Sequence, residues 1–163
     1  MRKISIKTII SILCSKFTLF LTKTILKGGT TFPGRVALKI DKNILSKVSK
    51  GYKVILVTGT NGKTTTTSMI YNIIKESGHP VITNNTGANL FPGIVTTFVD
   101  NFKFGSKVKD NYAVIEVDEA NLKYLAPFVL SVPLSAACAA LLAVLLTPFL
   151  IRLASFPDEA GPN

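Results

Sequence analysis

A short stretch rich in glycine, lysine and threonine has the residue types that bind phosphate: Thr58-Gly59-Thr60-Asn61-Gly62-Lys63-Thr64-Thr65. It joins a β-branched run to a helix-like segment, and at such a junction free backbone N–H groups and the helix dipole converge on an anion. Gly59 and Gly62 permit backbone conformations and a close approach that a Cβ would block. We predict that Lys63 reaches the β- and γ-phosphates of a nucleotide and that the Thr64 hydroxyl ligates Mg²⁺.

The strict phosphate-loop pattern, GxxxxGK followed by Ser or Thr, requires glycine at position 57, where this chain has Val57. A Gly-Lys-Thr tripeptide alone is weakly specific, so a coincidental turn is the alternative interpretation. The prediction depends on the position of the loop between a strand and a helix.

A single acid, Glu116, follows four residues of an apolar run near the end of a predicted strand. Phosphate-loop proteins place an acid there that holds Mg²⁺ directly or through water. A carboxylate at such a place is costly to bury without a partner, so the alternative is an exposed position at the edge of the strand. Asp118 and Glu119, just beyond it, are predicted to be solvated loop charges or groups that contact the metal ligands but not the metal itself.

The hydrophobic pattern predicts alternating strands and helices over the middle of the chain, with strands at 53–57, 80–83 and 112–117 and helices at 62–77 and 93–102. The β-branched run at 53–57 predicts a strand buried on both faces. This order predicts an α/β fold, specifically part of a three-layer α/β/α phosphate-loop domain with a parallel sheet. In such a sheet ligands bind beyond the carboxyl ends of the strands.

Residues 1–31 predict a basic amphipathic helix followed by a turn-rich break over 27–34. The helix either lies on a membrane surface or packs on the domain that follows. Lysines interrupt the apolar run and no A-x-A site follows, which argues against a secretory signal. Cys14 and Cys138 lie in apolar surroundings and predict buried, inert thiols. Apolar residues fall along one line of the helix and lysines along another: Ile6, Ile10, Leu13, Phe17 and Phe20, against Lys16, Lys23 and Lys27.

The formal charge of +10 is concentrated in the N-terminal third, where 12 of the 19 Lys and Arg precede residue 54 and Asp41 is the only acid. This distribution suits an anionic membrane lipid or an anionic substrate, with a merely solvated basic surface as the alternative. Nucleic acid is not expected as a partner, because no aromatic stacking platform accompanies the basic residues.

The stretch 126–151 has no charged residue and is long enough to span a bilayer, so it predicts a transmembrane-like helix and a possible single-pass anchor. A buried soluble helix is the alternative. Residues 145–154, LLTPFLIRLA, are similar to the first membrane helix of polyprenyl-phosphate N-acetylhexosamine-1-phosphate transferases. That similarity indicates a foreign fusion over 126–163 and no transferase activity.

Four motifs in order carry a more extensive resemblance. The loop TGTNGKTTTT at 58–67 resembles the ATP loop of the Mur ligase and folylpolyglutamate synthase superfamily, which also lacks the outer glycine. Three further segments resemble the MurT-type ligase subunits of lipid II isoglutaminyl synthase, and the whole resemblance covers about residues 1–125. These segments are FPGRVALKID at 32–41, NNTGANL at 84–90 and VIEVDEA at 114–120.

This resemblance implies an enzyme of peptidoglycan synthesis at the cytoplasmic face of the bacterial cell membrane. Its members use ATP and Mg²⁺ to activate the α-carboxyl of D-glutamate in lipid II, and a GatD-like glutaminase supplies the ammonia that gives D-isoglutamine. By position, Lys63 and Glu116 would be catalytic, Thr58–Thr65 would bind the nucleotide, and Thr64 and Glu116 would hold the metal. Asn85, Thr86 and Asn89 would face the substrate.

The resemblance also predicts segments that do not follow Glu119 here, namely the rest of the ATPase domain, a cysteine zinc ribbon and a C-terminal domain. We therefore divide the chain into 1–31, the start of an ATP-binding domain at 32–125, and the tail, and expect no ligase turnover from it alone. Two other hypotheses remain: a membrane-tethered nucleotide-binding protein without chemistry, and a non-functional product of gene fusion.

Overall fold

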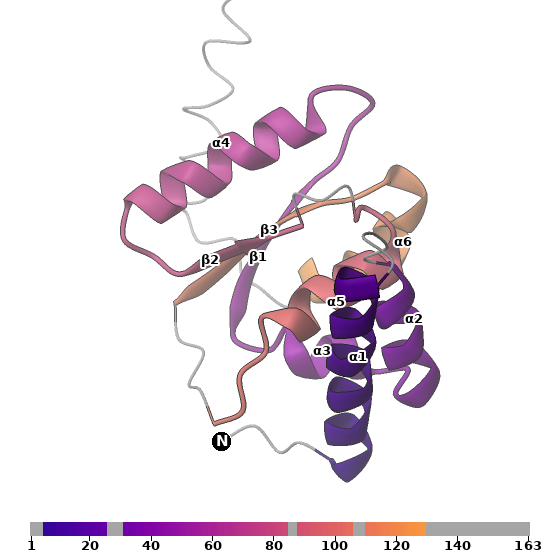
Figure 1. The fold of residues 1–163 in the computed structure, drawn as a ribbon. Coiled ribbons are helices and arrows are strands. Elements are labelled where there is room, and N and C mark those ends of the chain that lie inside the picture. Colours follow the sequence, from indigo (N-terminus) through magenta and orange to yellow (C-terminus); the bar gives the residue numbers. More distant parts are fainter. Residues whose placement is uncertain (1–4, 26–30, 85–87, 106–109, 130–163) are drawn as a thin grey trace, which may run out of the picture. The chain divides into compact units, whose positions relative to one another are not determined.

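The computed structural model describes residues 5–25, 31–84, 88–105 and 110–129, all within one compact unit that spans Met1–Ser131. Figure 1 shows the order of the elements. They are helices α1 (Ile6–Ile25), α2 (Thr31–Ile40) and α3 (Ile44–Val48), strand β1 (Tyr52–Val57), helix α4 (Lys63–Glu76), strand β2 (Val81–Thr83), helix α5 (Phe91–Asp100), strand β3 (Asn111–Glu116), a 3₁₀ turn η1 (Glu119–Asn121) and helix α6 (Leu122–Val129).

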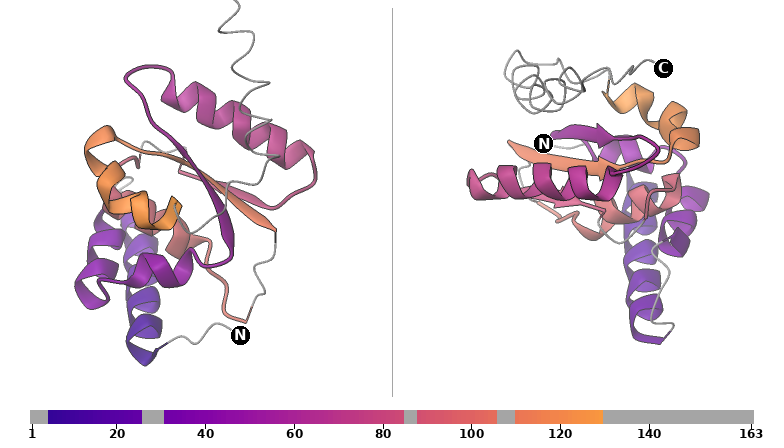
Figure 2. Two further views of the ribbon diagram at one scale, coloured as in Figure 1. Left: turned by 180° about the vertical axis from the view of Figure 1, so that it is seen from behind. Right: turned by 90° about the horizontal axis from the view of Figure 1, so that it is seen from above.

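The three strands form a parallel sheet in the order β1-β3-β2, so the last strand in sequence is the central one. Val57 at the end of β1 is level with Glu116 at the end of β3. Helix α4 packs on one face of the sheet, while α5 and α3 lie on the other, as Figures 1 and 2 show. The predicted α/β class with a parallel sheet is confirmed, and helix α4 begins directly beyond the strand ends.

Burial differs between the strands because of this order. Central strand β3 has its last four residues buried, with Val114 packed towards α4 and Ile115 towards α5. In β1, by contrast, Val54–Leu56 are only half-buried. Residues 54–57 pack against apolar clusters on both faces of the sheet, as predicted, but they are less buried than β3 because β1 is an edge strand of the described sheet.

Helix α5 forms although β-branched residues, which are poor helix formers, make up much of its sequence. Pro92 occupies its first turn, where a missing N–H does no harm. Most of the helix is then buried between the sheet and helices α2 and α3. Burial on several sides therefore outweighs the weak local propensity.

Helix α2 was not predicted, and it begins inside the segment 27–34 that the sequence indicates as a turn-rich break. Pro33 lies in the first turn of the helix, which tolerates proline. Gly34 follows it at the contact between α2 and α5, where an added Cβ would lie 1.8 Å from the carbonyl oxygen of Pro92. The glycine serves close helix packing here and not a turn.

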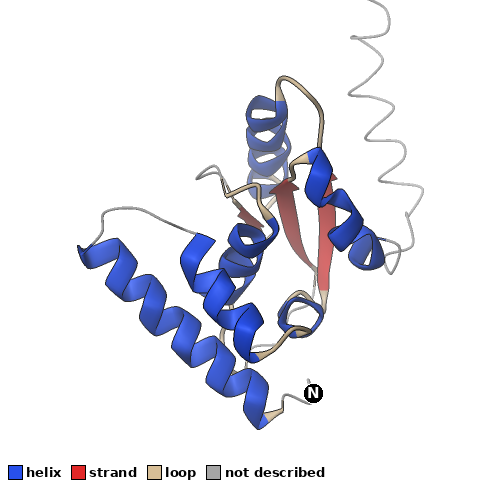
Figure 3. Ribbon diagram, turned by 90° about the vertical axis from the view of Figure 1, so that its right-hand side faces the viewer, coloured by secondary structure: helices blue, strands red, loops and turns tan. Residues whose placement is uncertain are grey.

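Helix α1 packs along α2 and also contacts α5, as Figure 3 shows for α1 and α2. Ile12 and Leu19 are buried, together with four hydroxyl-bearing residues of the same face, Thr8, Ser11, Ser15 and Thr22. The apolar line of the helix is exposed, and Cys14, predicted to be buried, is exposed too. The helix thus packs on the domain, but through the face opposite to the one that its hydrophobic pattern suggests.

A buried carboxylate, Asp41, ties α1 to α3. One of its oxygens accepts hydrogen bonds from the Thr8 hydroxyl at 2.7 Å and from Lys47 Nζ at 2.7 Å. The other accepts from the Asn43 backbone N–H at 3.1 Å. Burial by itself raises the pKa of Asp41, but the hydrogen bonds from Lys47, Thr8 and Asn43 together hold that pKa below its usual range.

We expect Asp41→Asn to lower the free energy of unfolding at pH 7 by about 1–3 kcal/mol, because the asparagine leaves Lys47 without its carboxylate. A carboxyl with a depressed folded pKa stabilises the fold above its unfolded pKa of about 3.9, and this contribution is lost as the pH falls through the lower folded value. The difference between wild type and variant should therefore shrink below pH ~4. Denaturant unfolding between pH 3 and pH 7 measures it, and a pH-independent difference would contradict the ion-pair explanation.

Within the described ranges, none of the helices combines the length and apolar character that crossing a membrane requires. The predicted transmembrane-like segment 126–151 lies outside these residues from position 130 onward, and so does Cys138.

Candidate functional site

The predicted phosphate loop connects β1 to α4 at the carboxyl edge of the sheet. Gly59 has φ 144° and Gly62 has φ 76°, both in the region that favours glycine. Gly62 caps α4, whose N-terminus has no side-chain cap and no acid in its first turn. The first N–H groups of a helix have no intrahelical partner, so this end of α4 presents donors and a positive dipole to an anion.

The ammonium of Lys63 folds back over this loop. Its Nζ donates to the carbonyl oxygens of Gly59 at 2.5 Å and Thr60 at 3.4 Å. The positive charge is therefore held at the mouth of the loop, four residues from the glycine that it contacts, and not against Glu116. A phosphate bound to the loop would compete with these carbonyl oxygens for the ammonium.

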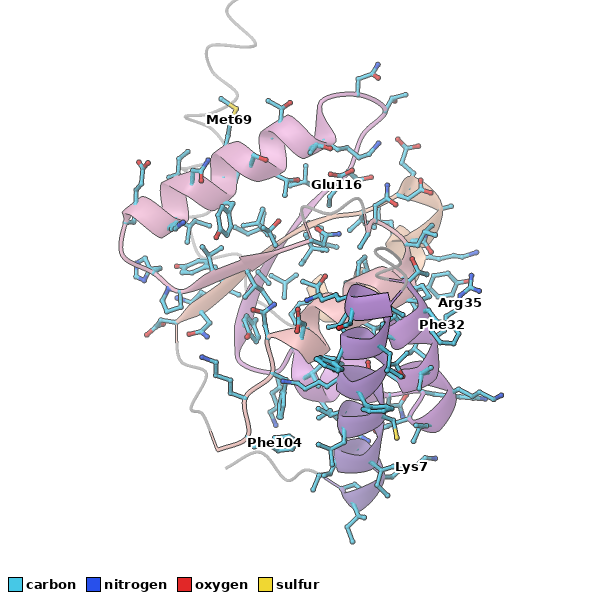
Figure 4. The ribbon with its side chains drawn as sticks, viewed as in Figure 1. Lys7, Phe32, Arg35, Met69, Phe104 and Glu116 are labelled. Carbon is cyan, nitrogen blue, oxygen red and sulfur yellow. The ribbon has the colours of Figure 1, made fainter. Side chains whose placement is uncertain are left out.

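Glu116 and Thr64 meet beside the loop, and Figure 4 shows Glu116 next to the start of α4. The Thr64 hydroxyl donates to Glu116 Oε2 at 2.9 Å, and it joins the first turn of α4 to the end of β3. Glu116 is 7% exposed, which excludes the alternative of a solvated residue at a strand edge. The structure thus brings together the two side chains predicted to hold a metal.

The backbone of Glu116 is held by Asn84, a residue that sequence reasoning did not select. Asn84 Nδ2 donates to the carbonyl oxygens of Glu116 at 2.8 Å and Ala88 at 2.9 Å, and Asn84 Oδ1 accepts from the Glu116 N–H at 2.8 Å. The side chain is buried and continues the β2–β3 pairing after β2 ends at Thr83. The sequence feature that could have indicated Asn84 is an amide residue directly after a short strand, within the motif at 84–90.

We expect Asn84→Asp to lower the free energy of unfolding by about 1–3 kcal/mol, because a carboxylate has no N–H to donate to the two carbonyl oxygens. The same change should weaken any ligand binding that depends on Glu116. Thermal unfolding with and without ligand measures both effects, and Asn101→Asp, at an exposed site at the end of α5, is the matched control. An equal loss in the two variants would show that Asn84 has no special positioning role.

The other predicted nucleotide-binding residues belong to the same loop or to the first turn of α4, and their side chains are exposed: Thr58, Thr60, Asn61 and Thr65. Of the predicted substrate residues, Asn85 and Thr86 lie outside the described residues. Asn89 is half-buried, and its backbone oxygen accepts from the Asp118 N–H at 3.2 Å. That bond places the 88–90 segment beside the residues that follow β3.

The residues present fit Mg²⁺ better than a metal that requires a full cage of protein ligands. In the described part of the chain, no group of three or more His, Cys, Asp or Glu converges on one point. Magnesium is held in nucleotide sites by one or two carboxylates together with phosphate oxygens and water. One carboxylate and one hydroxyl beside a phosphate loop supply the protein's share of such a site.

Comparison with known proteins shows which family this part of the chain is similar to. The family model of the Mur ligase middle domain matches residues 57–132, from the last residue of β1 to beyond α6. The MurT subunit of lipid II isoglutaminyl synthase (glutamine-hydrolyzing) from Streptococcus pneumoniae is 42% identical over 125 residues, which is 77% of this chain. The chain resembles the MurT-type Mur ligases. The resemblance recognised from the four motifs is confirmed.

Two other Mur proteins are similar to shorter parts of the chain. MurT from Staphylococcus aureus strain COL is 39% identical over 97 residues, 59% of this chain, and UDP-N-acetylmuramate–L-alanine ligase from Wolbachia pipientis is 40% identical over 79 residues, 48% of the chain. The chain spans 27% of the length of the Streptococcus pneumoniae MurT, 21% of the Staphylococcus aureus MurT and 14% of the Wolbachia ligase. The Mur ligase match includes the loop, Thr64 and Glu116.

Proposed function

We propose that this chain binds ATP with Mg²⁺ as part of a MurT-type amide ligase. The observation that carries the proposal is the 2.9 Å hydrogen bond between Thr64 and Glu116, directly beside the glycine loop at the start of α4. A phosphate loop requires a hydroxyl and a carboxylate at that place. The Mur ligase match over residues 57–132 supports the same conclusion from sequence alone.

Each group of the site has a distinct task in this proposal. The N–H groups at the start of α4 bind the phosphates, and the Lys63 ammonium turns from the loop carbonyls to the β- and γ-phosphates. Thr64 and Glu116 hold the metal, and Asn84 keeps Glu116 in place through its backbone. Bound Mg²⁺ supplies charge that neutralises the phosphates during transfer of the γ-phosphoryl group.

The acceptor and the partner are proposed from the relatives. We infer that the phosphoryl group is transferred to the α-carboxyl of D-glutamate in lipid II, and that a GatD-like glutaminase supplies the ammonia for amidation. The names of the MurT relatives, which include lipid II and glutamine hydrolysis, support this reaction. Similarity to a ligase whose name specifies L-alanine extends over a shorter part of the chain, 79 residues against 125 for the Streptococcus pneumoniae MurT.

The contribution of the metal can be tested with Glu116→Gln, which preserves shape but removes the charge. Wild type should gain more thermal stability from ATP with Mg²⁺ than from ATP with EDTA, and the variant should gain the same small amount from both. Loss of a group that only orients a metal ligand already lowers metal affinity by about 10–100-fold, so the loss of Glu116 should cost at least as much. Glu76→Gln, at an exposed acid in the last turn of α4, is the matched control and should behave as wild type. An undiminished magnesium effect in the Glu116 variant would refute the proposed metal site.

The reaction itself needs a separate assay. The chain is mixed with ATP, Mg²⁺, glutamine, lipid II and a GatD-like glutaminase, and the products are analysed for phosphate and D-isoglutamine. Formation of both supports the ligase proposal. ATP binding without either product would instead identify a nucleotide-binding protein that performs no chemistry under these conditions.

A further inference from the structure

Helix α1 presents a face of large apolar side chains to solvent. Five of them, on one side of the helix, are between 49% and 77% exposed: Ile6, Ile10, Leu13, Phe17 and Phe20. At ~100° per residue they occupy an arc opposite to the residues that pack on the domain. We call these five residues the outer face of α1.

Specific hydrogen bonds hold the outer face away from the domain. The hydroxyls of Ser11 and Ser15 donate to the α2 carbonyl oxygens of Ala37 at 2.8 Å and Pro33 at 2.9 Å. The Thr8 hydroxyl donates to Asp41 in the same way. Rotating α1 to bury its outer face would break these bonds and place large side chains where small ones now allow α1 and α2 to approach closely. The exposure is therefore a property of the packing.

Lysines border the outer face on both sides. Helix α1 contains no acid, and its lysines lie at the edges of the apolar arc, with Lys7 on one side and Lys16 and Lys23 on the other. Lys16 Nζ donates to the carbonyl oxygens of Phe102 at 2.7 Å and Asp100 at 3.4 Å, so Lys7 and Lys23 are the lysines that we assign to lipid contact. Lys23 pairs with Asp100 at the end of α5, but both side chains of this pair are largely exposed. Solvent screens such a pair, so the lysine can still contact an anion.

The surroundings of α1 add further positive charge. The only acid before residue 54, Asp41, is buried and paired with Lys47. On α2, Arg35 is exposed and lies beside the exposed Phe32, as Figure 4 shows. Apolar side chains bordered by basic ones are what an anionic lipid surface binds.

We propose that the outer face of α1 binds the surface of an anionic phospholipid membrane, with the helix lying parallel to the surface. The apolar side chains enter the boundary between headgroups and acyl chains, and the bordering lysines contact the lipid phosphates. Because the opposite face of α1 is packed on α2, lipid can reach it from one side only. This inference does not depend on ATP binding, and it concerns residues distant in sequence from the phosphate loop.

The chain contains no tryptophan, so a single substitution gives a specific reporter. Phe17→Trp places the indole on the outer face, and Met69→Trp places it at a 60% exposed site on α4 as the control. The full chain is used, so residues 126–151 are present in every variant. With vesicles of phosphatidylglycerol and phosphatidylcholine, the emission of the indole on α1 should shift to the blue and be quenched by brominated lipid. Phosphatidylcholine vesicles alone should bind at least tenfold more weakly, and the control should not respond.

A second substitution tests the apolar contribution. In the Phe17→Trp background, Phe20→Ser should weaken binding to the anionic vesicles by about tenfold or more, whereas Met69→Ser should not. Both sites are exposed, so the melting temperature should stay close to that of the parent. Three results would overturn the proposal. Vesicle binding without quenching of the indole on α1 would assign the binding to another segment, and equal binding to neutral vesicles would exclude the role of anionic lipid. A blue shift that grows with protein concentration in the absence of lipid would indicate that a second copy of the chain covers the outer face.

Discussion

Replacing Lys63 with alanine should abolish the stabilisation that ATP with Mg²⁺ gives to this chain. A ligand at 100 times its dissociation constant stabilises the folded state by about 2.7 kcal/mol. For a domain of this size that corresponds to roughly 10 °C in Tm. The ammonium is held at the loop by the Gly59 and Thr60 carbonyl oxygens, so the substitution removes the positive charge that would meet the phosphates there. Differential scanning fluorimetry across an ATP titration measures the loss.

Two controls make this result specific to the loop. Lys75→Ala removes a lysine from the last turn of the same helix, where its ammonium contacts the Tyr71 ring, and should keep the full ATP effect. AMP, which lacks the β- and γ-phosphates, should stabilise wild type little. If the Lys63 variant responds to ATP as wild type does, the glycine loop is not the phosphate site and the proposed function fails.

Replacing Gly34 with alanine should destabilise the fold severely, by roughly 3–5 kcal/mol. The added Cβ would lie 1.8 Å from the Pro92 carbonyl oxygen and 2.8 Å from the Thr96 hydroxyl oxygen. Both distances are shorter than real Cβ contacts, so α2 and α5 would have to separate. Helix α1 packs on both of these helices, and its position would change with them. Thermal unfolding followed by circular dichroism measures the effect.

Whether Gly34→Ala lowers or raises the free energy of unfolding distinguishes the packing of α2 on α5 from the helix propensity of the residue. Gly34 lies within a helix, and if only helix propensity mattered, alanine would stabilise the protein by about 0.5–1 kcal/mol. Lys39→Ala, at an exposed position of the same helix, should change the free energy of unfolding by less than about 0.5 kcal/mol. A Gly34 variant as stable as wild type would contradict the close approach of α2 and α5.

The geometry of the glycine loop was predictable because its requirements are local. Glycines at 59 and 62 are needed for the backbone of one short loop, and both adopt positive φ. The Lys-Thr pair follows at the start of the helix that the hydrophobic period predicts. Glu116 was predictable in type and approximate position, since an acid at the end of an apolar run requires a partner. The identity of that partner, the Thr64 hydroxyl 52 residues away, came from the structure.

The remaining features depend on contacts between distant segments. Asn84 carries no sequence pattern of its own, and its role arises because the β1-β3-β2 order places it beside Glu116. The same order makes β1 an edge strand, although its residues are as β-branched and apolar as those of a central one. In the same way, Gly34 is indistinguishable in sequence from a turn glycine until α5 packs against it.

The sequence alone determined the similarity to Mur ligases and the glycine loop between a strand and a helix, because loop geometry and periodicity depend on consecutive residues. Only the tertiary structure decided which face of α1 is buried. Periodicity reports that a helix has an apolar side, but hydroxyls that bond to the carbonyl oxygens of α2 can pack as closely as aliphatic groups. The small side chains of Ser11 and Ser15 allow that approach, and so the aromatic side of the helix remains exposed.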